Sequence, residues 1–82
     1  MVKSTKKAKK AKKICSLQLI AAKNIKFLRG KMDVSQEVLA DMIGCHRTYV
    51  GSVERSERNI TLSTLEAFAK ILKVHPSELL KD

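Results

Sequence analysis

The chain has 82 residues, of which 44% are hydrophobic, 4% are aromatic and none is tryptophan, and its formal net charge is +9. A chain of this length supports one domain with a thin core, because it buries only about 60% of its unfolded surface, so a partner subunit would add stability. Its apolar runs are too short to cross a bilayer, its two distant cysteines indicate free thiols in a reducing compartment, and its aliphatic residues favour helices over a β-sandwich.

The first 13 residues hold most of the positive charge. They contain seven lysines and no acidic residue, whereas the rest of the chain has ten basic and eight acidic residues. Like charges repel each other and resist packing, which predicts a flexible arm over residues 1–15 and a folded domain over residues 16–82. The alternative is an arm that adds non-specific attraction to phosphates.

Two helices are expected next. Apolar residues three and four positions apart predict a helix over about 16–30, broken by Gly30 and Asp33. A serine N-cap, an acidic first turn and Gly44 as terminator predict a second helix over about 35–43. The inner faces expected for these helices are Leu17, Ile20, Ala21, Ile25 and Leu28 in the first, and Val38, Leu39, Ala40 and Ile43 in the second.

Three further helices complete the prediction. A third is expected over 46–55, and a fourth over 61–74, where Thr61 or a capping box starting at Ser63 supplies the N-cap. A fifth begins at Pro76 and runs to the last residue. The inner face expected for the fourth helix is Leu62, Leu65, Ala69 and Leu72, with Phe68 and Ile71 beside them. No strand pattern occurs, so the predicted fold class is all-α, a compact five-helix domain.

The second and third helices are separated by a tight turn that contains glycine, which is typical of a helix-turn-helix. In that motif the first helix braces against the DNA backbone, and the start of the second enters the major groove. Arg47 can form two hydrogen bonds to a guanine, and Thr48 can meet a polar base edge or a thymine methyl. Tyr49 can reach a base or a phosphate, and Ser52 is small enough to let the helix approach the duplex. The sequence therefore predicts a double-stranded DNA-binding protein that reads bases with these four residues.

The same residues also have plainer interpretations. Arg47 can be a surface arginine paired with a carboxylate, and Tyr49 can be a half-buried tyrosine at the edge of the core. Arg55 and Arg58 can form ion pairs with nearby glutamates. Glu54 would be repelled by phosphates, so we expect it to brace an arginine inside the protein.

The adjacent Cys45 and His46 raise the question of a metal or nucleophilic site. Only Cys15 and His75 could complete a metal site, and no familiar ligand spacing links the four residues. A nucleophilic Cys–His pair also needs a third residue that orients the histidine, and the sequence shows none. It shows no glycine-rich phosphate-binding loop either. We therefore expect Cys45 to be buried at the turn, and we expect no metal, no cofactor and no enzymatic activity.

The segment VSQEVLADMIGCHRTYVGSVERSERNITLSTLEAFAKIL resembles the Cro/C1-type helix-turn-helix family. The positions that carry the resemblance are Ser35, Gln36, Glu37, Leu39, Ala40, Gly44, Arg47, Thr48, Tyr49, Val50, Val53, Glu54, Arg55, Arg58, Asn59, Thr64 and Leu65. The resemblance covers about residues 17–80, and RTYVGSVERSERNITLSTLE is most similar to the controller proteins of restriction–modification systems. The sequence departs from the pattern in four places. Asp33 stands where glycine is frequent, Ile60 where proline is frequent, and His46 where a better N-cap is common. The lysine-rich leader has no counterpart in the shared domain.

The resemblance implies a lambda-repressor-like fold and a small homodimer that regulates transcription from an inverted-repeat operator. It also implies phosphate contacts from Gln36, Arg55, Arg58 and Asn59. RNA polymerase is a further candidate partner, and the expected location is the cytoplasm of a bacterium or of a phage-infected cell.

Apolar residues near the end of the chain can be ordinary core, but they exceed what a small core can hold, which indicates that part of them forms a dimer interface. Doubling the recognition helix about a two-fold axis would match an inverted repeat about one DNA turn apart. The expected interface residues are Phe68, Ile71, Leu72, Val74, Leu79 and Leu80.

Other functions stay open as alternatives. One is a phage-type repressor, and another is an antitoxin-like module that mainly binds a partner protein through a segment beyond the domain, although the sequence stops at Asp82. A third is a general nucleic-acid binder governed by the lysine-rich arm. A sequence-specific regulator should keep its operator preference when residues 1–13 are deleted, whereas a general binder should not.

Overall fold

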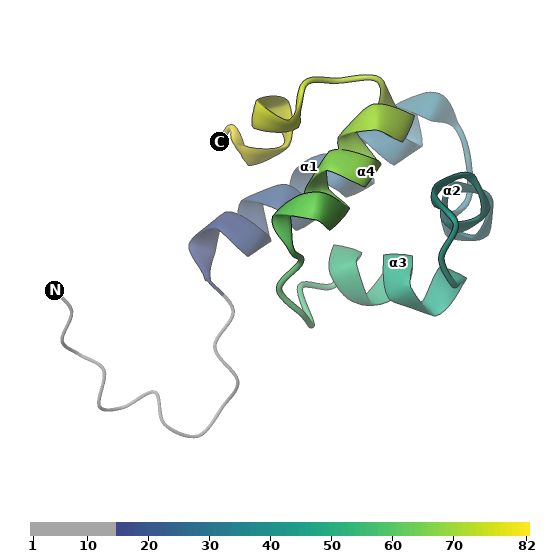
Figure 1. Cartoon of the computed structure of the whole chain (residues 1–82), viewed down its shortest axis with the longest axis horizontal. Helices are drawn as coiled ribbons and strands as arrows, with labels where there is room; N and C mark the ends of the chain where they lie inside the picture. The colour runs from purple at the N-terminus through teal and green to yellow at the C-terminus, as the bar shows by residue number, and fades with distance from the viewer. Residues whose placement is uncertain (1–14) are drawn as a thin grey trace, which may run out of the picture.

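A computed structural model describes residues 15–82, which form a helical domain (Figure 1). The predicted arm over residues 1–15 therefore lies almost entirely outside the described residues. Within the described part, the elements are α1 (Ser16–Met32), α2 (Gln36–Ile43), α3 (Arg47–Glu54), α4 (Leu62–Leu72) and a 3₁₀ helix, η2 (Pro76–Leu80). The all-α prediction is confirmed, but the fifth α-helix is wrong. A five-residue segment is too short to propagate α-helical hydrogen bonds, and 3₁₀ geometry is common in such short pieces.

The ends of α1 and α2 follow from backbone conformation. Asp33 adopts a left-handed conformation with φ 59°, and its N–H donates to the carbonyl of Gly30 at 3.0 Å. Aspartate tolerates this region better than most residues other than glycine, so Asp33 can stand where glycine is frequent. Gly30 itself continues the helix, so α1 ends two residues later than predicted. Gly44 ends α2 with φ 94°, where glycine lacks the Cβ that would strain the backbone.

Side chains cap the starts of the helices. The hydroxyl of Ser35 accepts a hydrogen bond from the N–H of Val38 at 3.0 Å. Thr61 accepts one from the N–H of Thr64 at 3.1 Å, which identifies Thr61 rather than Ser63 as the cap of α4. The capping hydrogen bonds satisfy N–H groups that lack partners within a helix.

The core gathers aliphatic side chains from all five elements around Phe68. Its buried members are Ala21, Ile25, Leu39, Ala40, Val50, Val53, Leu65, Phe68, Ala69, Leu72 and Leu79. The expected inner positions Leu17, Val38 and Leu62 are instead exposed. All three lie in the first turn of their helices, where the periodic pattern continues but the neighbouring elements no longer cover it.

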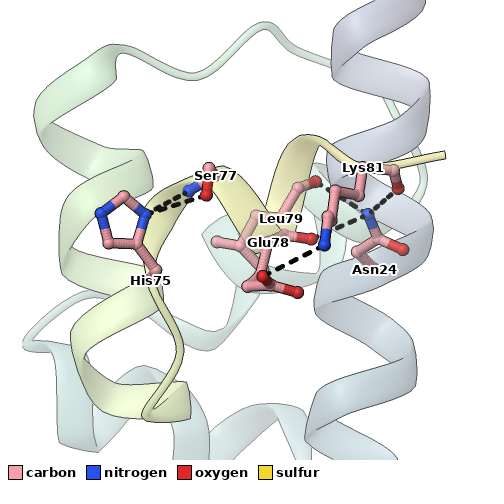
Figure 2. A network of polar contacts seen from close by, with 6 residues as sticks. All are labelled: Asn24, His75, Ser77, Glu78, Leu79 and Lys81. Atoms are coloured by element: carbon pink, nitrogen blue, oxygen red, sulfur yellow. Dashed lines mark hydrogen bonds and ion pairs between the residues drawn. The ribbon is translucent and has the colours of Figure 1, made fainter.

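Asn24 fastens η2 to α1 (Figure 2). Its Nδ2 group donates to the carbonyl oxygens of Leu79 and Lys81, each at 2.9 Å. A side-chain amide has two N–H donors, so both can be satisfied here. This attachment holds the buried Leu79 side chain against the core.

Candidate nucleic-acid interface

The helix-turn-helix is formed by α2, α3 and the turn between them. The N–H groups of Gly44 and Cys45 both donate to the carbonyl of Ala40, at 2.8 and 2.9 Å, which closes the turn. Val50 and Val53 are fully buried on the inner side of α3. Figure 1 shows α3 along the lower edge of the molecule, below α1 and α4. The other side of this helix is therefore left open.

The first turn of α3 presents the residues that the sequence singled out. Arg47 and Thr48 are exposed, and Tyr49 is half-buried where it packs against the core. The guanidinium carbon of Arg58 lies 5.0 Å from the centroid of the Tyr49 ring, which is a cation–π contact. Core packing and an outward role are thus compatible for Tyr49, and its ring holds Arg58 beside the start of α3.

His46 caps α3 with its side chain, at a position where serine or aspartate is more common. Its Nδ1 accepts a hydrogen bond from the N–H of Thr48 at 3.1 Å. The hydroxyl of Thr48 lies 2.8 Å from the same nitrogen. The imidazole therefore replaces the oxygen of a serine or aspartate cap, because its unprotonated nitrogen is also an acceptor.

Ser52 does not belong to the open face of α3. Its side chain is buried, with 7% of the residue exposed, and its hydroxyl donates to the carbonyl of Tyr49 at 2.8 Å. A Cβ at the neighbouring Gly51 would lie 3.0 Å from Nη1 of Arg55 and 3.3 Å from Oε1 of Gln36. Neighbouring groups of the protein itself therefore fill the space beside Gly51. The burial of Ser52 corrects the prediction that it contacts a base.

Glu54 is the centre of a buried polar network that joins three helices. Its carboxylate accepts from Nε and Nη2 of Arg29 at 2.7 and 3.1 Å, and from Nε2 of Gln36 at 2.9 Å. Arg29 also donates to the carbonyl of Val34 at 2.9 Å. The hydrogen bond to Glu54 raises the pKa of the Arg29 guanidinium above its ordinary value. The expectation that Glu54 braces an arginine is confirmed.

Sequence reasoning missed Arg29 as the partner of Glu54. A buried carboxylate needs a cation or several donors, but nothing in the spacing of 25 residues shows that Arg29 is the cation. Gln18 was also missed: its Oε1 accepts from the N–H of Ile60 at 3.0 Å, which fastens the segment after α3 to α1. The sequence signal for Gln18 was a polar glutamine within the apolar stripe of the first helix.

The segment after α3 carries the other predicted phosphate-binding residues. Arg55 is exposed and forms an ion pair with Glu57 at 2.8 Å, and this hydrogen bond raises the pKa of the Arg55 guanidinium. Arg58 and Asn59 are also exposed. The ion-pair alternative therefore holds for Arg55, whereas Arg58 stacks on Tyr49.

Cys45 lies partly buried at the turn before α3, and burial raises the pKa of its thiol. Across residues 15–82, no three His, Cys, Asp or Glu side chains lie together in a way that could hold a metal ion. None of the helices in the described part has the length and apolar content that crossing a bilayer requires.

The predicted dimer interface is partly wrong. Phe68 and Leu79 are fully buried in the monomer and Leu72 nearly so, which leaves them no surface for a partner. Partial exposure remains at Ile71, Val74 and Leu80. Three of the six residues predicted to form the interface therefore belong to the core of the monomer.

Two of the exposed apolar side chains lie together at the end of the molecule where α3 leads into α4. Leu62 is 79% exposed and Leu17 is 52% exposed, and both line a hollow that also includes Ala21, Leu65 and Leu80. We call these five residues the end patch. In Figure 1 the first turns of α1 and α4 and the C-terminus lie at this same end.

Comparison with known proteins matches residues 25–79 to the helix-turn-helix family. The control protein C.SmaI of Serratia marcescens is 49% identical over 69 residues, covering 82% of this chain and 82% of that protein. The control protein C.BamHI of Bacillus amyloliquefaciens is 36% identical over 66 residues, covering 79% of this chain and 82% of that protein.

Solved structures agree in fold. The restriction–modification controller protein C.AhdI of Aeromonas hydrophila has a TM-score of 0.72 and 37% identity, covering 76% of this chain and 94% of that one. The controller protein C.Esp1396I, solved as a tetramer with its natural 35 base-pair operator, has a TM-score of 0.72 and 32% identity, covering 79% of this chain and 86% of that one. The chain therefore belongs to the Cro/C1-type helix-turn-helix family of DNA-binding transcriptional regulators, as a relative of the restriction–modification controller proteins.

Proposed function

We propose that this protein is a restriction–modification controller that binds an inverted-repeat DNA operator as a two-fold dimer. The observation that carries the proposal is the open first turn of α3, where Arg47 and Thr48 are exposed on a helix that α2 braces from behind. A major groove accepts one α-helix, and an arginine at its leading end can bind a guanine through two hydrogen bonds. The 49% identity to C.SmaI supports the controller assignment.

Phosphate contacts would surround this reading surface. Arg58 is positioned by the Tyr49 ring, and Asn59 follows it in the exposed segment. Arg55 can exchange its exposed partner Glu57 for a phosphate, because a surface ion pair contributes little. Gln36 stands at the first position of α2, and because Glu54 accepts one of its two amide N–H groups, the other could donate to a DNA phosphate. Such contacts set orientation and affinity, and base contacts set specificity.

The dimer would form through the end patch. In a dimer with its two-fold axis at this end, the C-terminal ends of the two α3 helices would lie near the axis. The first turns of the two α3 helices would lie farther from the axis, where both could contact one duplex. The projecting Leu62 of each copy could then fill the hollow beside Leu17 and Leu80 of the other, as an isologous interface requires. The tetramer of C.Esp1396I on its operator supports assembly on DNA in this group. Contact with RNA polymerase stays a prediction.

The test compares Arg47→Ala with Arg58→Ala on a duplex selected by the wild-type protein from a randomised pool. Arg47→Ala should lower discrimination at one position in each half-site by about 1–3 kcal/mol. Arg58→Ala should weaken binding to specific and non-specific duplexes alike and reduce the salt slope by about 1. Lys70→Ala, which removes an exposed charge from α4, is the matched control and should change neither.

Two results would contradict the proposal. If the wild-type protein enriched no duplex, it would not bind DNA sequence-specifically. Unchanged base preference in Arg47→Ala would leave DNA binding intact but move the reading surface away from the first turn of α3.

A further inference from the structure

The N-cap of the recognition helix also constrains the hydroxyl that would read DNA. His46 Nδ1 lies 3.1 Å from the backbone nitrogen of Thr48 and 2.8 Å from the Thr48 hydroxyl oxygen. The backbone nitrogen always carries a hydrogen, so the imidazole nitrogen facing it must be the unprotonated acceptor. The neutral ring then carries its hydrogen on Nε2.

The same geometry decides where the Thr48 hydroxyl hydrogen lies. Two lone pairs facing each other across 2.8 Å would repel, and Nδ1 has no hydrogen to place between them. The only available hydrogen on that line is the hydroxyl hydrogen of Thr48. His46 therefore accepts from both the N–H and the O–H of Thr48, in a shared acceptor arrangement.

We propose that His46 makes Thr48 an acceptor-only contact, so that Thr48 selects a base with an amino group in the major groove. A hydroxyl has one donor and two acceptor lone pairs, and here the donor is already used within the protein. Adenine and cytosine present amino donors at this edge, whereas guanine and thymine present carbonyl oxygens. Thr48 would then accept from adenine N6 or cytosine N4 and reject the other two bases at that position of the strand. This inference rests on the proposed function and specifies how its reading surface works.

A second histidine in the chain repeats the geometry away from α3. His75 Nδ1 lies 3.1 Å from the backbone nitrogen of Ser77 and 2.9 Å from its hydroxyl, at the start of η2 (Figure 2). Removing His75 takes away an equivalent cap without touching Thr48. The chain thus offers its own matched control.

The experiment selects preferred duplexes from a randomised pool with the full-length wild-type protein and with four variants. Thr48→Val keeps the shape and methyl group but lacks the hydroxyl, and it should lose preference at one position per half-site. At that position the wild-type protein should prefer adenine or cytosine on one strand over guanine or thymine by about tenfold.

His46→Ala should remove most of that discrimination, because the freed hydroxyl hydrogen can donate to a carbonyl oxygen. His46→Asn retains an acceptor at the cap and should restore the preference, and His75→Ala should leave it unchanged. The comparison uses ratios between bases for each variant, so a general loss of affinity from a weakened helix start does not affect it.

Several outcomes would overturn the inference while leaving sequence-specific binding intact. These are a guanine or thymine preference at the Thr48-dependent position, the absence of any such position, or an unchanged ratio in His46→Ala. Failure of the wild-type protein to enrich any duplex would instead overturn the proposed function and this inference together.

A measurement without DNA tests the chemical premise directly. Nitrogen–proton correlation spectra of the imidazole rings in the free protein, assigned by comparison with His46→Ala, should place the His46 hydrogen on Nε2. A hydrogen on Nδ1 at neutral pH would overturn the inference, whatever duplex the protein selects.

Discussion

Glu54 illustrates how a single side chain connects the two helices of the helix-turn-helix to the rest of the domain. Its carboxylate lies on α3, and its partners Arg29 and Gln36 lie on α1 and α2. The side chain of Glu54 is 2% exposed and that of Arg29 is 17% exposed, so water screens this ion pair weakly. Removing one member would leave the other as a poorly solvated charge.

We therefore expect Glu54→Ala to lower the free energy of unfolding by about 3 kcal/mol, measured by urea denaturation. Glu57→Ala is the matched control, because its ion pair with Arg55 is more than half exposed on both sides, so water screens it and its loss should lower the free energy of unfolding much less. Equal losses in the two variants would show that the buried network does not stabilise the fold more than a surface pair does.

The sequence allowed part of the Glu54 network to be predicted. An acidic side chain on a helix that meets DNA is repelled by phosphates, so an internal role for Glu54 could be inferred without a structure. The identity of Arg29 could not, because α1 contains several basic residues and only the packing of α1 against α3 selects one of them.

At the scale of elements, local signals located the helices well. Caps and terminators act within a few residues, so Ser35, Gly44 and Thr61 mark helix ends in the sequence as they do in the structure. The exception is η2, which the sequence presents as a helix starting at Pro76. Its five residues are too few to propagate α-helical hydrogen bonds, and it adopts 3₁₀ geometry instead.

Asn24→Ala should loosen η2 selectively. The carbonyls of Leu79 and Lys81 would lose their donor, at a cost of about 1 kcal/mol, and hydrogen exchange at the amides of η2 should become faster. The control is Lys23→Ala, whose ion pair with Asp82 is 3.9 Å long and exposed. Faster exchange throughout α1 and α4 in Asn24→Ala would show that this contact stabilises the whole domain instead of one segment.

At the scale of the whole molecule, the small domain buries the apolar residues of α4 and η2 more completely than its length suggested. Phe68, Leu72 and Leu79 all enter the core, and the apolar surface that remains at the end patch comes from the first turns of two helices. An exposed leucine beside an apolar hollow is a surface that a second copy can cover reciprocally.

Leu62→Glu should weaken dimerisation by about tenfold or more, measured by sedimentation equilibrium, because it places a charge in the proposed interface. Folding should be little affected, since Leu62 is mostly exposed in the monomer. Leu19→Glu, at an exposed leucine of α1 outside the hollow, is the matched control and should dimerise as the wild-type protein does. Equal dimerisation by the two variants would place the interface elsewhere.

The sequence by itself determined the helical class, the position of the helix-turn-helix and the candidate reading residues Arg47, Thr48 and Tyr49. Periodicity, capping and turn formation depend on neighbours a few positions apart, so they can be read along the chain. Only the tertiary structure decided which of the remaining residues face outward. It buried Ser52, Phe68 and Leu79, exposed Leu62, and joined Arg29 to Glu54. Those outcomes depend on how helices distant in the sequence cover one another, and a helical pattern alone does not show which part of its apolar stripe a neighbour will cover.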